Sequence, residues 1–209
     1  MPHNNAQNIP HVAWTDHRIL RRPDSAADDQ ETDANRELVP VFSPGATKRD
    51  LGMAYYLALF DGNNGAEPKA LALLQSQKTE IESDKAALDA LGILSLERGD
   101  YSTAESCFRR VLSMDASDLT ALSDMGTLLA KQGNLTGSVA MLRKAFDRNR
   151  DIAGLATNLA RVECMTGNVS EFRDTLRSAL IYNSTAKDLR QMMDHSGECR
   201  ISGGKATGQ

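Results

Sequence analysis

Histidine and cysteine are the side chains most able to do chemistry in this sequence, and they are few. Three of the four histidines, His3, His11 and His17, lie before residue 18, and the fourth is His195. A catalytic nucleophile needs a base beside it, and phosphate and zinc chemistry carry motifs of their own. The sequence has no G-x-S-x-G, no phosphate-cradling glycine loop and no H-E-x-x-H. We therefore expect no enzyme and, in the chain as given, no cofactor.

The cysteines point to neither a metal site nor a disulfide framework. Cys107, Cys164 and Cys199 lack the spacing of metal ligands, and three cysteines are too few for the framework of a small secreted domain. Cys107 and Cys164 fall in helical segments, where we expect them to fill small buried spaces. Cys199 falls in a glycine-rich tail.

Composition limits the classes of function. The chain is 41% hydrophobic and 25% charged, with a net charge of −4, and it has no basic stripe. These values are ordinary for a soluble globular chain and argue against nucleic-acid binding. No apolar run is long enough to span a membrane, and the first residues do not read as a secretory leader. As read from this chain, the expected location is cytoplasmic.

A fixed period organises the chain from residue 51 onward. Gly65, Gly99, Gly133 and Gly167 are 34 residues apart, which is the period of a helix–turn–helix repeat array. The sequence therefore divides into four blocks, which begin at Leu51, Lys85, Leu119 and Ala153.

The same side-chain types recur within each block. Positions 7, 10 and 24 are large and apolar, which predicts helical stripes that pack against each other. Position 8 carries a residue without bulk, because the second helix of the pair crosses there; it is Ala58, Gly92, Gly126 and Ala160. Position 20 faces that crossing and is Ala70, Ala104, Ser138 and, as an exception, Phe172. We expect the last pair either to splay or to use Phe172 to cover the end of the array.

The glycine at position 15 predicts the turn between the two helices of each block. Glycine ends a helix in the left-handed conformation without steric cost. Asp100, Asn134 and Asn168 follow three of these glycines and can cap the next helix. Thr47 and Asp50 predict a capping box ahead of the first block.

These residues resemble the tetratricopeptide repeat family. The closest match is Leu91-Gly92, Gly99-Asp100-Tyr101, Ala104 and Phe108, and the resemblance covers about residues 51–184. The sequence departs from the family pattern in having no Trp at position 4, no Tyr at position 11 and no Pro at position 32. The resemblance implies an all-α fold, a right-handed superhelical solenoid of four helix pairs. It also implies that a partner protein or peptide binds in the concave groove.

The first helices of such an array line its groove, and this implies a set of partner-binding residues. They are Tyr55, Leu59, Asp89, Ile93, Leu96, Glu97, Ser123, Thr127, Lys131, Asn158 and Arg161. We expect Leu59, Ile93 and Leu96 to carry most of the affinity. Thr127 and its polar neighbours could equally be a solvated face. Lys131, Asn158 and Arg161 form the one basic and polar grouping.

The two ends of the chain differ from the repeats in composition. Residues 1–46 are expected to be a largely disordered segment or linker, residues 47–195 the array with a C-terminal capping helix, and residues 196–209 a disordered tail. The capping helix is expected over 184–194, with Leu189, Met192 and Met193 facing the array.

Residues 1–23 carry a second resemblance. Met1-Pro2-His3 and the stretch from Ile9 to His17 are similar to the end of a multihaem cytochrome c domain that precedes such repeats in some bacterial proteins. The C-x-x-C-H motif is absent, so covalent haem c is expected only in a longer parent, with His11 or His17 as axial ligands. The alternative is a disordered tail with accidental histidines.

Two functions therefore remain open. The first is an interaction scaffold that binds a protein or peptide, with neither nucleic acid nor a membrane span. The second is the C-terminal part of a multihaem electron-transfer protein, which would place the chain in the periplasm. The partner, the pathway and the oligomeric state stay open.

Overall fold

The described part of the chain is helical throughout. The computed structural model describes residue 38 and residues 45–63 and 65–199. Within these residues there are nine α-helices, one short 3₁₀ helix and no strand. The helices are α1 (Lys48–Ala58), α2 (Ala66–Ser76), α3 (Lys85–Glu97), α4 (Tyr101–Met114), α5 (Leu119–Lys131), α6 (Leu135–Arg148), α7 (Ala153–Met165), α8 (Val169–Tyr182), α9 (Lys187–Asp194) and η2 (Ser196–Glu198). The all-α prediction is confirmed.

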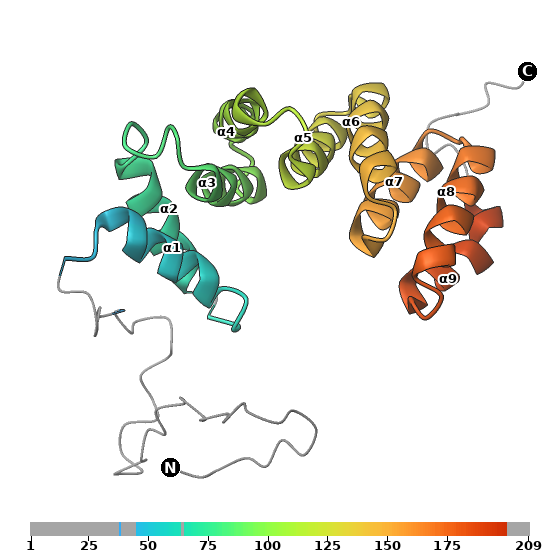
Figure 1. Ribbon diagram of the computed structural model, residues 1–209, viewed down its shortest axis with the longest axis horizontal. Coiled ribbons are helices and arrows are strands. Elements are labelled where there is room, and N and C mark those ends of the chain that lie inside the picture. The colour runs from blue at the N-terminus through green and yellow to red at the C-terminus, as the bar shows by residue number, and fades with distance from the viewer. Residues whose placement is uncertain (1–37, 39–44, 64, 200–209) are drawn as a thin grey trace, which may run out of the picture. The chain divides into compact units, whose positions relative to one another are not determined.

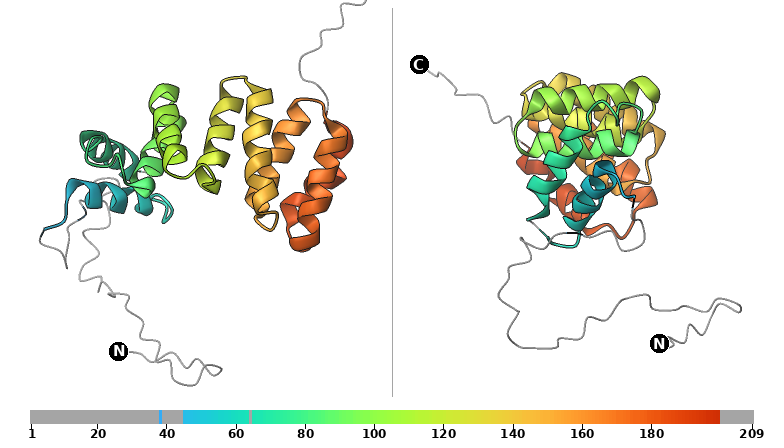
Figure 2. Two further views of the ribbon diagram at one scale, coloured as in Figure 1. Left: turned by 45° about the horizontal axis from the view of Figure 1, so that its top comes forward. Right: turned by 90° about the vertical axis from the view of Figure 1, so that its left-hand side faces the viewer.

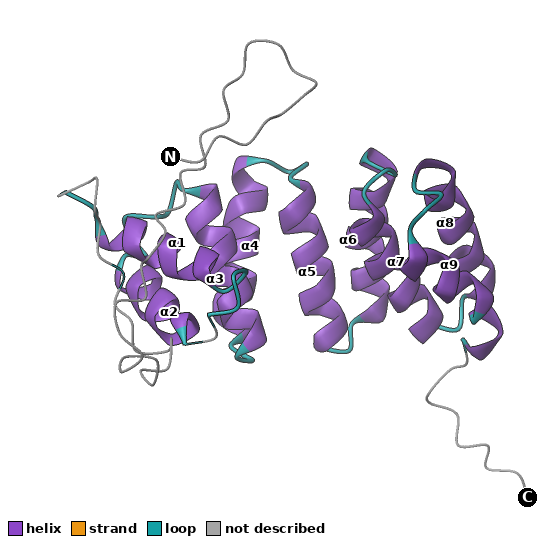
Figure 3. Ribbon diagram, turned by 90° about the horizontal axis from the view of Figure 1, so that it is seen from below, coloured by secondary structure: helices purple, strands orange, loops and turns teal. Residues whose placement is uncertain are grey.

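Consecutive helices pack as pairs, and the pairs stack in chain order (Figure 1). The pairs are α1 with α2, α3 with α4, α5 with α6 and α7 with α8. Each odd-numbered helix also contacts the next odd-numbered one, from α1 through to α9, whereas the even-numbered helices lack comparable contacts with one another among the described residues. The odd-numbered helices therefore form the inner, concave row and the even-numbered helices the outer row (Figures 2 and 3).

Small residues stand where the helices of a pair cross. A Cβ atom added to Gly92 would lie 2.5 Å from the Phe108 ring, and one added to Gly126 would lie 2.6 Å from the Leu142 Cγ atom. The Ser138 hydroxyl donates a hydrogen bond of 2.6 Å to the Gly126 carbonyl oxygen across the same crossing. The close crossing predicted at position 8 is thus confirmed for the second and third blocks, and position 20 is shown to face it in the third.

The predicted glycine turns are confirmed in three blocks. Gly99, Gly133 and Gly167 have φ values of 78°, 82° and 76°. The next helix is capped by the Asp100 carboxylate, which accepts from the Thr103 N–H, and by the Asn134 amide oxygen, which accepts from the Gly137 N–H. Asn168 makes no such side-chain cap.

In the first block the turn glycine is not the one that the 34-residue spacing predicts, so the sequence prediction is wrong there. Gly65 has a φ of −74°, and the left-handed residue is instead Gly62, at 87°. The N–H of Asn63 bonds to the carbonyl of Ala58, just as the N–H of Asp100 bonds to that of Ser95, so Gly62-Asn63 is the equivalent turn. The spacing of Gly65 from Gly99 is therefore not a structural repeat.

Because α1 ends at Ala58, the prediction that the large apolar residues around this end are buried is also wrong. Leu57 and Phe60, assigned to positions 7 and 10, are 58% and 74% exposed. The close approach to α2 is made by Gly52, where an added Cβ would lie 3.0 Å from the Leu74 side chain, and not by Ala58. The predicted Thr47–Asp50 capping box is present and begins α1 as expected.

The last pair is closed by the C-terminal helix. Phe172 is 2% exposed and lies in one apolar cluster with Leu159, Ala160 and Leu189. Leu189 of α9 is fully buried, with Met192 and Met193 partly buried against the same cluster. The predicted capping helix is confirmed, and Phe172 is part of the core that this helix covers.

The tail prediction is wrong for residues 196–199. These residues form η2 and a buried Cys199, which is bonded to Cys164. The predicted disordered segment at 1–37 lies outside the described residues, as does most of the linker up to residue 44 and the tail from residue 200. No helix among the described residues is long and apolar enough to cross a membrane.

Candidate partner-binding groove

The inner row of helices displays most of the predicted partner-binding residues, but not all of them. Tyr55, Leu96 and Ser123 are only 4%, 4% and 7% exposed. The Tyr55 hydroxyl accepts a hydrogen bond from the Leu38 N–H, and Leu96 packs in the core cluster with Phe108. These three side chains belong to the core, so Leu96 cannot carry affinity as the sequence suggested. The others are partly or fully exposed, and they are Leu59, Asp89, Ile93, Glu97, Thr127, Lys131, Asn158 and Arg161.

A pocket of about 260 Å³ lies between α5 and α7. It brings together Thr127, Lys131, Asn158 and Arg161, with Met165 at its apolar side. The basic and polar grouping inferred from the sequence is therefore one surface in the fold.

The two cations of this pocket differ in their partners. Lys131 forms an ion pair with Glu97 of the preceding repeat at 3.5 Å. Arg161 has no ion pair or hydrogen bond within the described part of the chain. An exposed pair such as Lys131–Glu97 contributes little to stability. The guanidinium of Arg161 is free to meet an anionic or carbonyl group.

A hydrogen bond to a buried residue of α5 holds the Asn158 side chain in place. Its amide nitrogen donates a hydrogen bond of 3.2 Å to the buried hydroxyl of Ser123, on the neighbouring helix. Ser123, which its position in the repeat assigned to the groove, thus positions a groove residue without reaching the surface itself.

The part of the groove toward the N-terminal repeats carries two carboxylates. Asp89 of α3 and Asp124 of α5 are both partly buried, and neither forms an ion pair or a hydrogen bond among the described residues. Burial raises the pKa of Asp89 to about 6, with the Asp118 charge adding to the shift and Lys85 opposing it. Burial raises the pKa of Asp124 to about 7, and the charges of Asp89 and Asp118 add to it.

Tyr56 of α1 completes this acidic region. Burial and the negative charges of Asp124 and Asp89 raise the pKa of Tyr56. Side chains of α1, α3 and α5 therefore interact electrostatically in this region. The sequence analysis found Asp89 but missed Asp124 and Tyr56, because both occupy position 6 of their blocks. The signal was a charged residue between the buried Leu122 and Met125 of one helix.

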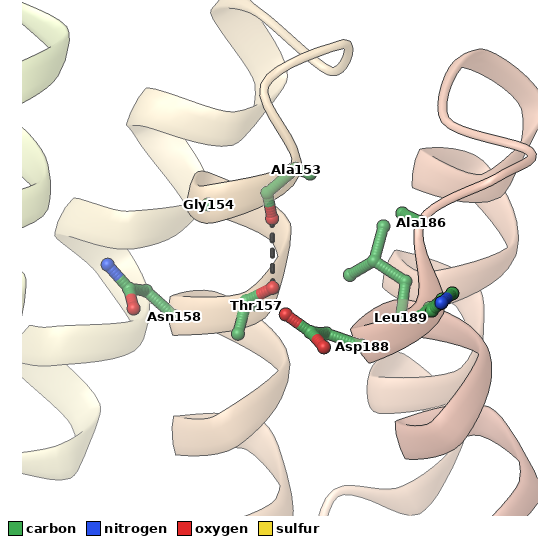
Figure 4. A pocket seen from close by; sticks show the side chains of 8 residues that line it. Ala153, Gly154, Thr157, Asn158, Ala186, Asp188 and Leu189 are labelled. Carbon is green, nitrogen blue, oxygen red and sulfur yellow. Dashed lines mark hydrogen bonds between the residues drawn. The ribbon is translucent and has the colours of Figure 1, made fainter.

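A second pocket, of about 420 Å³, lies between α7 and the capping helix α9. Figure 4 shows Thr157 and Asn158 on one wall and Asp188 and Leu189 on the other. The Thr157 hydroxyl is turned to its own helix, where it donates to the Ala153 carbonyl at 3.0 Å (Figure 4). The capping helix therefore forms the end of the groove as well as covering the core.

The cysteines are arranged differently from the prediction. Cys164 of α7 and Cys199 form a disulfide, with their Cα atoms 4.9 Å apart. The sequence could not pair them because Cys199 returns to α7 only through the fold of α8, α9 and η2. Cys107 is free and buried as expected, and burial raises the pKa of its thiol to about 11.

A partly buried ion pair joins α6 to α7. The Glu163 side chain is fully buried, and its carboxylate accepts from the Arg143 guanidinium of α6. Arg143 also donates to the Thr175 hydroxyl at 3.2 Å, so it links α6, α7 and α8. Burial raises the pKa of Glu163, and Thr175 and Arg143 oppose that shift.

The described residues offer little for catalysis. No group of three or more His, Cys, Asp or Glu side chains within them is placed to hold a metal ion. His195 is exposed at the end of α9, with its ring nitrogen Nδ1 against the Gln191 carbonyl oxygen, and Cys107 is buried. His11 and His17, the candidate haem ligands of a longer parent, lie outside the described residues.

Comparison with known proteins identifies the repeat. The tetratricopeptide repeat family model matches residues 119–156, which span α5, α6 and the start of α7. This segment of the chain therefore matches one tetratricopeptide repeat. No curated protein matches the sequence.

Solved structures of tetratricopeptide proteins share the fold. MamA from strain AMB-1 is 18% identical, with a TM-score of 0.61 over 74% of this chain and 88% of that one. PilF of Pseudomonas aeruginosa is 17% identical, with a TM-score of 0.61 over 71% of this chain and 67% of that one. The TPR2B domain of yeast Sti1, in complex with pHsp70, is 17% identical, with a TM-score of 0.50 over 57% of this chain and 99% of that one. At these identities the likeness concerns the fold. The stacked helix pairs of repeat arrays form extended concave surfaces that such proteins use for binding.

Proposed function

We propose that this array binds an extended segment of a partner protein along the inner faces of α1, α3, α5 and α7, and that the segment carries a lysine or arginine. The observation that carries the proposal is the pair Asp89 and Asp124 on neighbouring inner helices. Both carboxylates are partly buried, and neither forms an ion pair or a hydrogen bond among the described residues. The Sti1 domain, which shares the fold, was solved in complex with pHsp70.

The energetics of the pair favour a cationic guest. A carboxylate that leaves water without a partner loses solvation, which is why the pKa values of both groups are raised. An ammonium or guanidinium group between them would supply the missing partner and favour both ionised forms. Binding of such a group should therefore release protons.

The two halves of the groove also differ in charge, which would orient the guest. Asp89 and Asp124 lie toward the N-terminal repeats, whereas Arg161 and Lys131 line the pocket between α5 and α7. A segment with a basic side chain and, further along, an acidic side chain or a free carboxylate fits one direction only. Leu59 and Ile93, both partly exposed, provide apolar contact beside the acidic half.

A synthetic peptide array tests the proposal. Random 12-residue peptides would be screened on the full chain, and each binder resynthesised with norleucine in place of its lysines. We expect binders to be rich in Lys and Arg, and the norleucine versions to bind at least about tenfold more weakly. Asp89→Asn and Asp124→Asn should weaken the lysine peptides similarly.

Asp147→Asn is the matched control, because Asp147 lies on the outer helix α6 and pairs with Arg150 there. It should leave affinity unchanged. Binders without basic residues, or binders indifferent to both groove substitutions, would refute the cationic guest. Binding that survives Leu59→Glu and Ile93→Glu as well would refute the groove itself.

The alternative function, the end of a multihaem cytochrome c, rests on residues 1–23. We propose one test for it: material from the native source should show a Soret band on a larger polypeptide. A colourless protein near 22.7 kDa would contradict this alternative.

A further inference from the structure

Apart from the continuous chain after α8, one covalent bond, the Cys164–Cys199 disulfide, joins the C-terminal cap (residues 187–199) to the array. After α8 the chain forms α9 and η2, and Cys199 then returns to Cys164 near the end of α7, 35 residues earlier. Cys199 is 8% exposed, so its sulfur lies within the apolar cluster of the last repeats. The only other described polar link from η2 to a neighbouring helix is the Arg173 side chain of α8, which donates to the Ser196 hydroxyl at 3.1 Å.

The cap is weak by itself. Helix α9 has only eight residues, and its N-cap, Ala186, offers no side-chain oxygen to the free N–H groups of the first turn. Isolated helices of this length are unstable in water, so α9 persists only because it is docked. Its docking rests on one fully buried side chain, Leu189, on two partly buried methionines and on the disulfide.

What the cap covers matters for binding. Asp188 and Leu189 form one wall of the pocket of about 420 Å³, and Thr157 and Asn158 of α7 form the other (Figure 4). This pocket ends the inner face of the array. If α9 undocks, the pocket loses the wall formed by Asp188 and Leu189. The apolar surface of α7 and α8 around Phe172 is then exposed to solvent.

We propose that the Cys164–Cys199 disulfide is a reversible latch, and that a dithiol reductant opens the cap and with it the end of the groove. Cys164 is partly exposed, whereas Cys199 is buried, so a thiolate of the reductant attacks the Cys164 sulfur. Cys199 leaves as a thiolate and takes up a proton. The second thiol of the reductant then displaces Cys164, which gives two protein thiols and one disulfide of the reductant.

The remaining cysteine takes no part in this exchange. Cys107 of α4 is 2% exposed, and its thiol pKa of about 11 leaves almost no thiolate at neutral pH. Disulfides persist in oxidising compartments, so the latch is closed there and opens where dithiol reductants act.

Hydrogen exchange on the full chain, with and without dithiothreitol, tests the latch. Complete reduction, confirmed by alkylation and intact mass, should speed amide exchange over 187–199 by about tenfold or more, because the cross-link no longer limits the open state. Exchange over α5 and α6 (119–148) should not change. Cys199→Ser should show the fast exchange without reductant, and Cys107→Ser should keep the full response to it.

Two results would overturn the proposal. One is equal protection of 187–199 before and after complete reduction, which would mean that the apolar contacts alone hold the cap. The other is a protein, purified under air without reductant, in which Cys164 and Cys199 are both alkylated while 187–199 stays protected.

Discussion

The backbone of Gly126 lies against the side chain of Leu142, so closely that an added Cβ would come within 2.6 Å of the Leu142 Cγ atom. Gly126 belongs to α5 and Leu142 to α6, so this contact fixes how closely the two helices of the third repeat approach. The same relationship joins Gly92 to Phe108 in the second repeat.

The first prediction concerns this crossing. Gly126→Ala should destabilise the fold by about 1–3 kcal/mol, because the added methyl group overpacks a tight contact. Gly154→Ala is the matched control: an added Cβ there meets nothing within 4 Å, and alanine is the better helix former by about 1 kcal/mol. Urea unfolding measures both. A Gly126→Ala variant as stable as the wild type would show that the helices can separate without loss.

The second prediction separates the true turn glycines from the accidental one. Gly133→Ser should cost about 1–2 kcal/mol, because Gly133 has a φ of 82° and a side chain strains that conformation. The same substitution at Gly65, whose φ is −74° at the N-cap of α2, should be neutral or slightly stabilising, since serine caps helices well. Thermal unfolding compares the stability of the two variants directly. Equal losses of stability would mean that Gly65 is a turn glycine like Gly133.

The third prediction concerns the dependence of stability on pH. The folded pKa of Asp124, about 7, lies above that of an unfolded chain, so the folded state holds its proton more tightly and stability falls as pH rises from about 4 to about 7. Asp89, Asp118 and Tyr56 face this group, and Lys85 acts on Asp89. Asp124→Asn should be more stable than the wild type at pH 8 by on the order of 1–2 kcal/mol.

At pH 4 the stability gain of Asp124→Asn should shrink to a small remainder, because the wild-type carboxyl is then protonated in the folded state and about half protonated in the unfolded chain. Asp147→Asn, at an exposed site, should show no such difference between the two pH values. The measurement is the difference between variant and wild-type free energies of unfolding at each pH. A constant difference would mean that Asp124 keeps an ordinary pKa.

The fourth prediction concerns the buried carboxylate of Glu163. Arg143→Met removes its cationic partner and should cost about 3 kcal/mol at pH 8, since it leaves a charge buried without compensation. The loss should shrink at pH 5, because the pKa of Glu163 rises further and the carboxyl becomes neutral. Arg177→Met, which breaks the exposed pair with Asp174, should cost less than about 1 kcal/mol at either pH. Equal losses for Arg143→Met at both pH values would contradict this account.

Residues close in the chain were predicted well. The turn at Gly133 and the cap at Asn134 follow from local backbone chemistry, and the small residue at Gly126 follows from a crossing with a helix that begins only a few residues later. The groove was predicted less well. Leu96 and Ser123 have suitable residue types but are buried, because the face that a helix turns inward depends on both of its neighbours.

By itself the sequence determined the all-helical repeat array and the tight pairing of its middle repeats, because a 34-residue period of small and apolar residues can bury its faces only by stacking helix pairs. The tertiary structure decided three further matters. It moved the first turn to Gly62, it placed Asp89 and Asp124 near each other with no ion-pair partner among the described residues, and it joined Cys164 to Cys199. The pairing of Asp89 with Asp124 and the disulfide join residues about one repeat apart, and the angle at which successive helix pairs stack sets such distances.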